Sequence, residues 1–390
     1  MFAERVKGLK GSAIREMFKL LAQPDMISFA GGAPAPELFP CELLGEISQK
    51  ILADNGRQAL QYGISEGYAP LRDYTLSRML KMGNIHSHDE LIITSGGQQA
   101  LDLTFKSLVN ENDVVVLESP SFIGGMNSLR SYNTVLHGIE MQEDGMDIQA
   151  LEEVLKTQKI KLVYTISTFQ NPSGITMSLE KRKQLLCLAE KYDFYILEDN
   201  PYGELRYRGD GVATIKSLDT EGRVIYAGSY SKTISPGLRL GWVIARQDIM
   251  EKIVICKQVS DVHTTVLPQM MASEFFKVYD YDAHIEKAKA LYRERCDAMI
   301  SALDTYFPEG CTHTIPEGGI FLWCTLPEGY DSDALLKEAV SRKVAFVAGS
   351  TCMPIPCEGA RYLRLNYSLT SPEVIREGIK RLGEVIRNAK

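Results

Sequence analysis

Residues 224–245 read VIYAGSYSKTISPGLRLGWVIA, two apolar runs separated by a short polar segment. The runs, Val224–Gly228 and Gly241–Ala245, have the nearly continuous apolar character of strands that are buried on both faces. The segment between them is too short for a crossover helix, which predicts that one strand of the pair runs antiparallel. Lys232 lies in this segment among hydroxyl residues, whereas a lysine meant for solvent normally lies on a charged helical face.

Short apolar runs continue upstream to residue 90, and amphipathic stretches separate most of them. This alternation predicts an α/β fold whose large domain has three layers, α/β/α, around a mostly parallel sheet of seven strands. The other expected strands are Leu91–Thr94, Val114–Glu118, Thr134–Ile139, Leu162–Ile166 and Tyr195–Glu198. The expected helices are Gln98–Leu108, Leu151–Lys156 and Leu179–Tyr192.

After about residue 275 the pattern changes to a smaller α+β domain, which begins with a long amphipathic helix over Ala283–Leu303. Its further elements are Gly318–Cys324, Leu335–Val340, Val344–Val347, Tyr362–Asn366 and a helix from Pro372 to about Ile386. The Pro- and Gly-punctuated start of the chain is expected to join it. The large domain is therefore expected over residues 51–275, and the small domain over residues 1–50 and 276–390.

The composition is ordinary for a globular protein, with 45% hydrophobic and 24% charged residues in a chain of 390. A net charge of −7 and scattered basic residues argue against nucleic acid or an anionic membrane as a partner. No apolar run approaches the roughly 18 residues of a membrane span, and the charged start lacks a signal peptide's apolar region. Eight cysteines without CxxC spacing predict free thiols, and no metal site is expected. These features favour a cytoplasmic protein.

Lys232 is a candidate for forming a Schiff base with an aldehyde cofactor. The hydroxyls of Ser229 and Ser231 and the guanidinium of Arg239 make an anion site beside it. Pyridoxal 5′-phosphate (PLP) is the cofactor that carries both an aldehyde and a phosphate. Taken alone, a lysine in a polar loop at a strand end explains the pattern equally well.

Asp199 falls at the carboxyl end of the expected strand Tyr195–Glu198, where open α/β sheets bind their ligands. A PLP enzyme needs a carboxylate there to keep the pyridine nitrogen protonated, so that the ring withdraws electrons. Tyr202, three residues on, offers a phenol to the cofactor's ring hydroxyl. The alternative is a turn former, which Pro201 would also suit.

Ser95-Gly96-Gly97-Gln98 follows the strand Leu91–Thr94 and opens a helix. Glycine lets the backbone approach a ligand, and the helix N-terminus offers free N–H groups to a phosphate. Glycines are common in such turns, so this signal gains its weight from Ser229, Ser231 and Arg239.

Together these segments resemble the fold-type I, class I/II PLP-dependent aminotransferases, and among them the 2-aminoadipate, kynurenine and related broad-specificity enzymes. The resemblance runs from about Gly11 to the C-terminus. Besides the segments above, its markers are Ser12-Ala13-Ile14-Arg15-Glu16, Phe29-Ala30-Gly31-Gly32, Pro36-Glu37-Leu38-Phe39-Pro40, Gln61-Tyr62, Ser95 to Ala100 and Gln170-Asn171-Pro172-Ser173-Gly174.

The resemblance implies that Gly96, Gly97 and Gln98 form the backbone side of the phosphate cup. It implies that Phe122 stacks on the pyridine ring, where many relatives have tyrosine, so that this chain keeps the ring at this position and lacks the hydroxyl. Asn171 is expected to bond the ring oxygen and the substrate carboxylate, although Asn-Pro followed by Gly is also a good turn.

Further roles implied by the resemblance concern the substrate and the subunits. Arg364 is expected to bind the substrate α-carboxylate, with Arg361 as the competing candidate, and Gly32 is expected to contact the substrate. Tyr62 is expected to reach the cofactor phosphate of the neighbouring subunit in a homodimer. Arg15 is expected to lie on a lid segment and to meet a distal carboxylate, although a solvated helix face explains it too.

The implied activity is ping-pong transamination between an L-amino acid and a 2-oxo acid, with 2-oxoglutarate as the expected acceptor and Lys232 as the proton carrier. Two alternatives stay open. Another PLP reaction, such as β-elimination or decarboxylation, would use the same cofactor site. A non-enzymatic regulator domain would carry a winged-helix segment, but the residues before Leu60 match aminotransferase markers instead.

Overall fold

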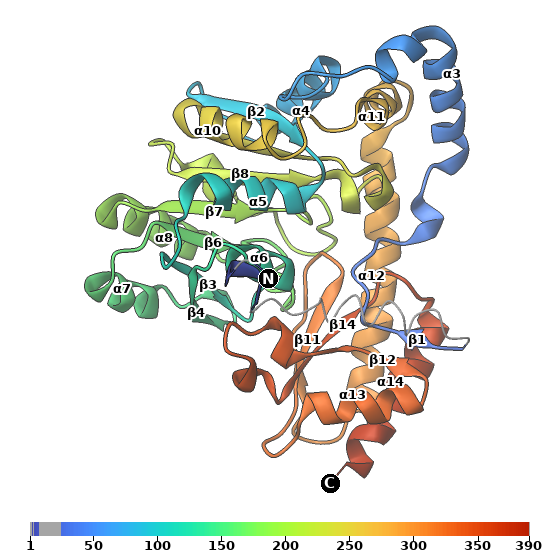
Figure 1. Cartoon of the computed structure of the whole chain (residues 1–390). Helices are drawn as coiled ribbons and strands as arrows, with labels where there is room; N and C mark the ends of the chain where they lie inside the picture. Colours follow the sequence, from blue (N-terminus) through green and yellow to red (C-terminus); the bar gives the residue numbers. More distant parts are fainter. Residues whose placement is uncertain (1, 3, 8–24, 390) are drawn as a thin grey trace.

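The structure is a computed structural model that describes residue 2, residues 4–7 and residues 25–389. Figure 1 shows a large α/β part in the upper half of the view and a smaller α+β part below it. The long helix α12 (Tyr281–Tyr306) runs along both parts. This architecture confirms the predicted fold class.

The large domain is built on one sheet of eight strands in the order β2-β9-β8-β7-β6-β3-β4-β5. Neighbouring strands from β8 to β4 are parallel, while β9 is antiparallel to both of its neighbours, as the short lysine segment predicts. All seven expected strands form, and the eighth is a two-residue edge strand that the sequence did not reveal. The strands are β2 (Asp89–Thr94), β3 (Val114–Ser119), β4 (Val135–Gln142), β5 (Gly145–Met146), β6 (Leu162–Thr165), β7 (Tyr195–Asp199), β8 (Val224–Ser229) and β9 (Gly241–Arg246).

Helices cover both faces of this sheet, and the three expected helices correspond to α5, α7 and α8. The helices of this part are α3 (Cys41–Ala59), α4 (Ala69–Lys81), α5 (Gly97–Leu108), α6 (Ile123–Arg130), α7 (Ile148–Thr157), α8 (Leu179–Tyr192), α9 (Ile215–Leu218), α10 (Gln247–Gln258) and α11 (Val266–Val278).

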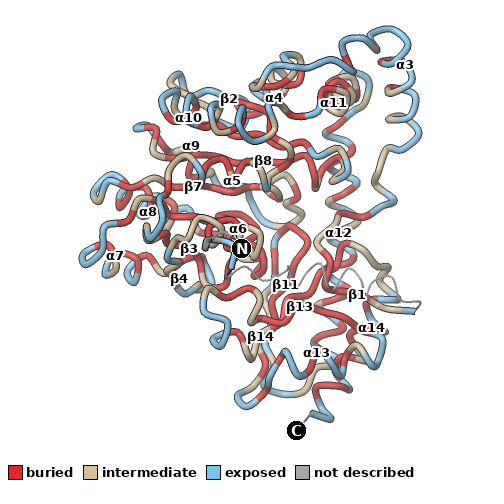
Figure 2. The backbone as a smooth tube through the Cα atoms, in the orientation of Figure 1, coloured by how far each residue is buried: buried red, intermediate tan, exposed pale blue. Residues whose placement is uncertain are grey.

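Alternate residues of each strand enter different core clusters because side chains of a strand point to opposite faces. On β8, Ile225 and Ala227 pack with α5, α6 and α10, whereas Val224 packs with α7, α8 and α9 on the other face. On β9, Val243 joins the first cluster and Trp242 packs with α3, α4 and α11. The central strands β6, β7, β8 and β9 are accordingly buried along nearly their whole length, whereas β4 near the sheet edge is mostly half-buried or exposed, and the outer helices carry many exposed residues (Figure 2).

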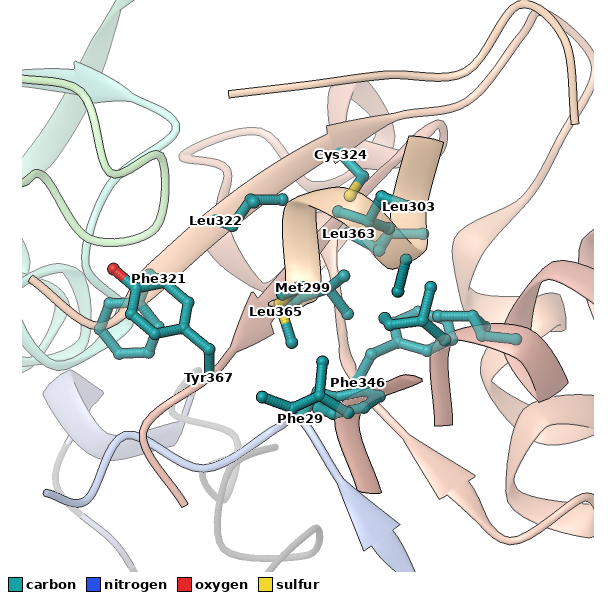
Figure 3. Packing of buried hydrophobic residues seen from close by; sticks show 14 of the residues in the cluster. Phe29, Met299, Leu303, Phe321, Leu322, Cys324, Phe346, Leu363, Leu365 and Tyr367 are labelled. Atoms are coloured by element: carbon teal, nitrogen blue, oxygen red, sulfur yellow. The ribbon is translucent and has the colours of Figure 1, made fainter. Parts of the chain in front are cut away.

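The small domain contains a four-stranded antiparallel sheet in the order β10-β11-β14-β13 and a two-stranded parallel pair, β1 with β12. Figure 3 shows Phe29, Met299, Leu303 and Leu365 converging in its core. Its elements are β1 (Ile27–Ser28), β10 (Thr312–His313), β11 (Phe321–Thr325), α13 (Ser332–Ser341), β12 (Val344–Ala345), β13 (Val347–Ala348), β14 (Tyr362–Asn366) and α14 (Pro372–Asn388).

Two boundaries in this domain differ from those expected. The strand expected over Gly318–Cys324 begins at Phe321, because Gly319 has a φ of +71° and turns the chain against the Phe169 ring. The single strand expected over Val344–Val347 is two strands that pair with different partners.

The predicted domain boundary at residue 50 falls inside α3. Ile47 and Ile51, on either side of it, lie in the same large-domain cluster, whereas Phe29 packs in the small domain. The domain limits stay a prediction, and this packing favours a first boundary at the start of α3. Helix α12 joins the two parts, since Tyr281 packs in the large domain and Leu303 in the small one.

Candidate active site

The carboxyl ends of the central strands open onto a cavity of about 370 Å³ between the two domains. A volume of this size lies in the range of small-molecule sites. Twelve of the residues singled out in the sequence line it, and these are Gly32, Gly97, Gln98, Phe122, Asn171, Asp199, Tyr202, Ser229, Ser231, Lys232, Arg239 and Arg364.

Lys232 ends a short 3₁₀ turn, Tyr230–Lys232, directly after β8. Its Nζ donates a hydrogen bond to the carbonyl oxygen of Gly32, a small-domain residue. Burial, and then the positive charges of Arg364 and Arg239, lower the pKa of Lys232 to about 8. A lysine with this pKa supplies a useful fraction of neutral amine near pH 7, as a nucleophile or general base requires.

Asp199 is the last residue of β7 and is 5% exposed. The hydroxyl of Tyr164 donates to its Oδ2 over 2.9 Å and is its only donor among the described residues. Burial raises the pKa of Asp199 to about 7, the Tyr164 hydrogen bond opposes that rise, and Glu118 adds to it. A cation placed beside this carboxylate would be strongly favoured, because it would stabilise the charged form.

The expected phosphate cup lies where the start of α5 meets the lysine segment. Ser229 Oγ donates a hydrogen bond to Ser231 Oγ over 2.9 Å, and Arg239 Nη2 donates one to the Ser95 carbonyl over 3.1 Å. Gly96 has a φ of +81°, and a Cβ at this position would overlap the Arg239 guanidinium. Gly97 has room for a Cβ, with Ser229 Cβ at 3.5 Å, so this position tolerates a larger residue.

Arg364 lies on β14 and is 2% exposed. It donates to Asn171 Oδ1 over 3.0 Å and to the Ala30 carbonyl over 2.8 Å, and its guanidinium lies 4.3 Å from the centre of the Phe321 ring. Among the described residues, its Nε has no hydrogen-bond partner and no carboxylate pairs with it. Arg361 instead donates to the Leu326 carbonyl and does not line the cavity.

Tyr202 and Phe122 supply aromatic rings to the cavity. Tyr202 is 5% exposed and meets Phe321 edge-on at 5.8 Å between ring centres. Burial and the charge of Asp199 raise the pKa of Tyr202, so its phenol stays protonated. Phe122 caps the start of α6, and its ring lies where a Cβ on Gly124 would overlap it.

Two of the described residues that were expected at the site, Gly96 and Tyr62, do not line the cavity. Gly96 lies behind it, against Arg239. Tyr62 is 81% exposed, with its ring edge-on to His263 at 5.8 Å. Arg15 lies outside the described residues.

The family model of aminotransferase class I and II matches residues 24–382. Aromatic-amino-acid aminotransferase 1 from Thermococcus litoralis is 44% identical over 392 residues, covering 99% of this chain and 94% of that protein. A kynurenine aminotransferase from Pyrococcus horikoshii, solved in complex with PMP, is 40% identical with a TM-score of 0.96, covering 100% of this chain and 97% of that one. The α-aminoadipate aminotransferase of Thermus thermophilus, solved with N-(5′-phosphopyridoxyl)-L-leucine, is 37% identical with a TM-score of 0.92, covering 99% and 97%.

The chain belongs to the class I and II aminotransferases. It is a PLP-dependent transaminase of fold type I, as the sequence segments predict.

The residues of this aminotransferase fit PLP. The serine hydroxyls, Arg239 and the first N–H groups of α5 are donors suited to a phosphate. The Asp199 carboxylate could accept a hydrogen bond from a protonated ring nitrogen, and the Lys232 amine could react with an aldehyde. The described residues contain no group of His, Cys, Asp or Glu side chains placed to hold a metal ion. In the same described part of the chain, no helix is long and apolar enough to cross a membrane.

Sequence reasoning missed Tyr164, Glu118 and Phe321. Tyr164 lies on β6 opposite Leu197 of β7, so its hydroxyl reaches Asp199 only through the strand pairing. Glu118 is fully buried at the end of β3, where Thr165, the Ile166 N–H and Gln170 donate to it, and burial raises its pKa. A charged residue at the end of an apolar strand was the available signal for Glu118, and none marked the other two.

Proposed function

We propose that this aminotransferase moves an amino group between an L-amino acid and a 2-oxo acid, with 2-oxoglutarate as the acceptor, and that Lys232, Asp199 and Arg364 carry the reaction. The observation that supports these roles is that all three line one cavity and have no ion-pair partner among the described residues, with Asp199 and Arg364 buried and Lys232 half-buried. Buried charges are costly unless they are paired, so each of them requires a partner from a ligand.

Arg364 binds the substrate α-carboxylate in this proposal. Asn171 and the Ala30 carbonyl hold its guanidinium, and its unpartnered Nε is available to a ligand oxygen. An arginine fork held in this way orients a carboxylate through two hydrogen bonds and so fixes the amino group over the reacting carbon.

PLP, when bound, supplies an aldehyde carbon and an electron-withdrawing pyridine ring. Lys232 donates and removes the proton at the substrate Cα, for which its lowered pKa suits it. Asp199 holds a proton at the ring nitrogen, and Tyr164 fixes the orientation of the Asp199 carboxylate. Tyr202 offers its phenol to the ring oxygen, and Phe122 excludes water from one side of the cavity.

We also propose a homodimer in which Tyr62 completes the partner's site. Its supporting observation is an exposed apolar surface around that residue, formed by Leu60, Tyr62, Ile64, Val259 and Val262, which are 50–81% exposed. Exposed apolar surfaces of this kind mark association sites. A cytoplasmic location and the lid role of Arg15 stay predictions.

An acceptor experiment tests the reaction. The PLP-loaded enzyme is given aromatic, branched and acidic amino acids with 2-oxoglutarate, and glutamate formation is measured. We expect glutamate to form with amino acids of the aromatic and acidic classes, the classes in the names of the relatives. Pyruvate and ammonia released without any acceptor would identify a lyase instead.

Arg15→Ala separates the lid proposal from a solvated arginine. We expect at least a roughly tenfold selective loss of kcat/KM on glutamate and 2-aminoadipate, because a charge-assisted bond of about 1.5–3 kcal/mol is removed. Leucine and phenylalanine serve as controls. An equal change on all four substrates would rule the lid role out.

A further inference from the structure

A partly buried polar network adjoins the turn that opens α5. It consists of Ser95, Gln99, Lys257, Asp261 and Thr264, and we call it the Lys257 network. Lys257 Nζ donates to Gln99 Oε1, Asp261 Oδ1 and Thr264 Oγ1, each over 2.9 Å. Lys257 is fully buried, and the Asp261 side chain is 27% exposed. The ammonium thus has an acceptor for each of its protons.

The network fixes the side-chain amide of Gln99 in one orientation. Its Oε1 accepts from Lys257 and from the Ser95 N–H at 2.7 Å, while its Nε2 donates to Asp261 Oδ2 over 2.7 Å. A flipped amide would place its NH₂ against two donors and its oxygen against a carboxylate. Gln99 is the third residue of α5, and a glutamine there that reaches back to the preceding backbone holds the helix start in place.

Ser95 is held through all of its polar atoms. Its N–H is bound by Gln99, its hydroxyl donates to Asp261 Oδ2 over 2.9 Å, and its carbonyl accepts from Arg239 at 3.1 Å. The next residues, Gly96 and Gly97, are the N-cap and first residue of α5. The position of Ser95 therefore sets both where the free N–H groups of α5 point and where the Arg239 guanidinium lies.

We infer that Lys257 and Asp261 are positioning residues of the cofactor's phosphate site. They do not line the cavity, and they act by holding Ser95 and Gln99. This inference rests on the proposed phosphate cup. Hydrogen-bond donors fixed before binding lose less entropy on binding a phosphate than mobile ones, so loosening the network weakens phosphate affinity.

The chain offers a matched control in a second buried lysine–aspartate pair. Lys216 Nζ lies 2.7 Å from Asp89 Oδ1, both side chains are fully buried, and Lys216 also donates to the Val224 carbonyl. Asp89 begins β2, and Lys216 on α9 reaches the first residue of β8, so the pair lies at the end of the sheet opposite the cavity. Removing Lys216 should therefore destabilise the large domain at least as strongly as removing Lys257 does, and it leaves the phosphate cup intact.

The test compares PLP with pyridoxal, which lacks the phosphate. Dissociation constants of both are measured on the apoenzymes of the parent, Lys257→Met and Lys216→Met, together with their Tm values. In the parent, we expect PLP to bind more tightly than pyridoxal. In Lys257→Met we expect this preference to fall by about tenfold or more, with pyridoxal binding unchanged. In Lys216→Met we expect the parent's preference at a comparably lowered Tm.

A Lys257→Met enzyme with the parent's preference, or with PLP and pyridoxal weakened equally, would overturn the inference. If that variant does not fold, Ser95→Ala is measured in its place. It deletes only the hydroxyl that donates to Asp261, and its dissociation constants for PLP and pyridoxal decide the question in the same way. Equal affinity of the parent for PLP and pyridoxal would overturn the phosphate site itself, so failure of the proposed function is distinguishable.

Discussion

Glu198 and Asp199 are consecutive carboxylates at the end of β7, and they point to opposite faces of the sheet. Glu198 accepts hydrogen bonds from Ser167 Oγ and from the Ile215 and Lys216 N–H groups, and Arg182 lies 4.0 Å away. Asp199 has one donor among the described residues, the Tyr164 hydroxyl, and faces the cavity.

The lysines repeat this contrast. Lys216 is paired with Asp89, whereas Lys232 has only the Gly32 carbonyl among the described residues. A buried charge with its partners in place belongs to the fold, since removing one partner leaves the other uncompensated. A charge that lacks a partner and lines a cavity is arranged for a ligand, because binding of the ligand offsets the free-energy cost of leaving that charge unpaired. The paired charges, Glu198 and Lys216, should therefore lose stability when substituted. The unpaired charges, Asp199 and Lys232, should lose activity instead.

Substitution of Lys232 has the largest expected effect. Lys232→Ala removes the nucleophile and the proton carrier together, so we expect transamination to fall by about a thousandfold or more. Apoenzyme Tm should not fall, because no ion pair is broken. Lys216→Met is the control, with a lowered Tm and activity per folded enzyme near that of the parent. Near-normal turnover by Lys232→Ala would remove the site assignment.

Asp199→Asn should lower kcat by about a hundredfold or more, because an amide cannot stabilise a protonated ring nitrogen as a carboxylate does. Steady-state rates and the absorbance spectrum of the PLP-loaded enzyme measure this. Glu198→Gln sharpens the comparison, since it should leave the chemical step intact and lower the free energy of unfolding by about 3 kcal/mol. An Asp199→Asn enzyme with the parent's rate and spectrum would make Asp199 a turn residue only.

Arg364→Met should lower kcat/KM for amino acids by about thirtyfold or more, the loss typical when a buried charge pair with a ligand is broken. Arg361→Met, on the same strand region but outside the cavity, should stay within about threefold of the parent. Kinetics on one good amino-acid substrate decide between them. A larger loss in the Arg361 variant would exchange the two roles.

The sequence predicted most of the residues that line this cavity because they lie in contiguous segments after apolar runs. Lys232 and Arg239 share one loop, and Asp199 and Tyr202 share another, so strand ends alone bring them to one edge of the sheet. Tyr164 could not be predicted in this way, because its contact with Asp199 depends on the register of β6 against β7. Phe321 reaches the cavity from the small domain, whose orientation no local pattern encodes.

The same limit applies to the fold. Strands buried on both faces, such as Val224–Ser229, were evident from their apolar character. The edge strand Gly145–Met146 has two residues and no pattern of its own. It forms because the chain turns back after Gln142 and pairs antiparallel with Met141 and Gln142. Helix α6 contains Gly124 and Gly125, which lower helix propensity, and Gly125 is required where the Tyr164 ring approaches.

A smaller effect concerns pH. The pKa of Asp199 is raised to about 7 in the folded apoenzyme, above its ordinary value of 3.8, mainly by burial. Between these values the folded state binds more protons than the unfolded state, so Asp199 lowers apoenzyme stability progressively as pH rises from about 4 to 7. Urea unfolding of the parent and of Asp199→Asn over that range should show this fall only in the parent. Parallel curves would contradict the unpaired state of Asp199.

The central claim, that Lys232 is the lysine arranged for the cofactor, is tested most directly by location of the bound PLP. The PLP-loaded enzyme is reduced with borohydride and digested, and its peptides are mapped by mass spectrometry. Among the described residues, the half-buried Lys232 then competes with two buried lysines, Lys216 and Lys257. We predict a phosphopyridoxyl group on Lys232 alone. A group on either paired lysine, or PLP that is bound without a covalent link, would contradict the account.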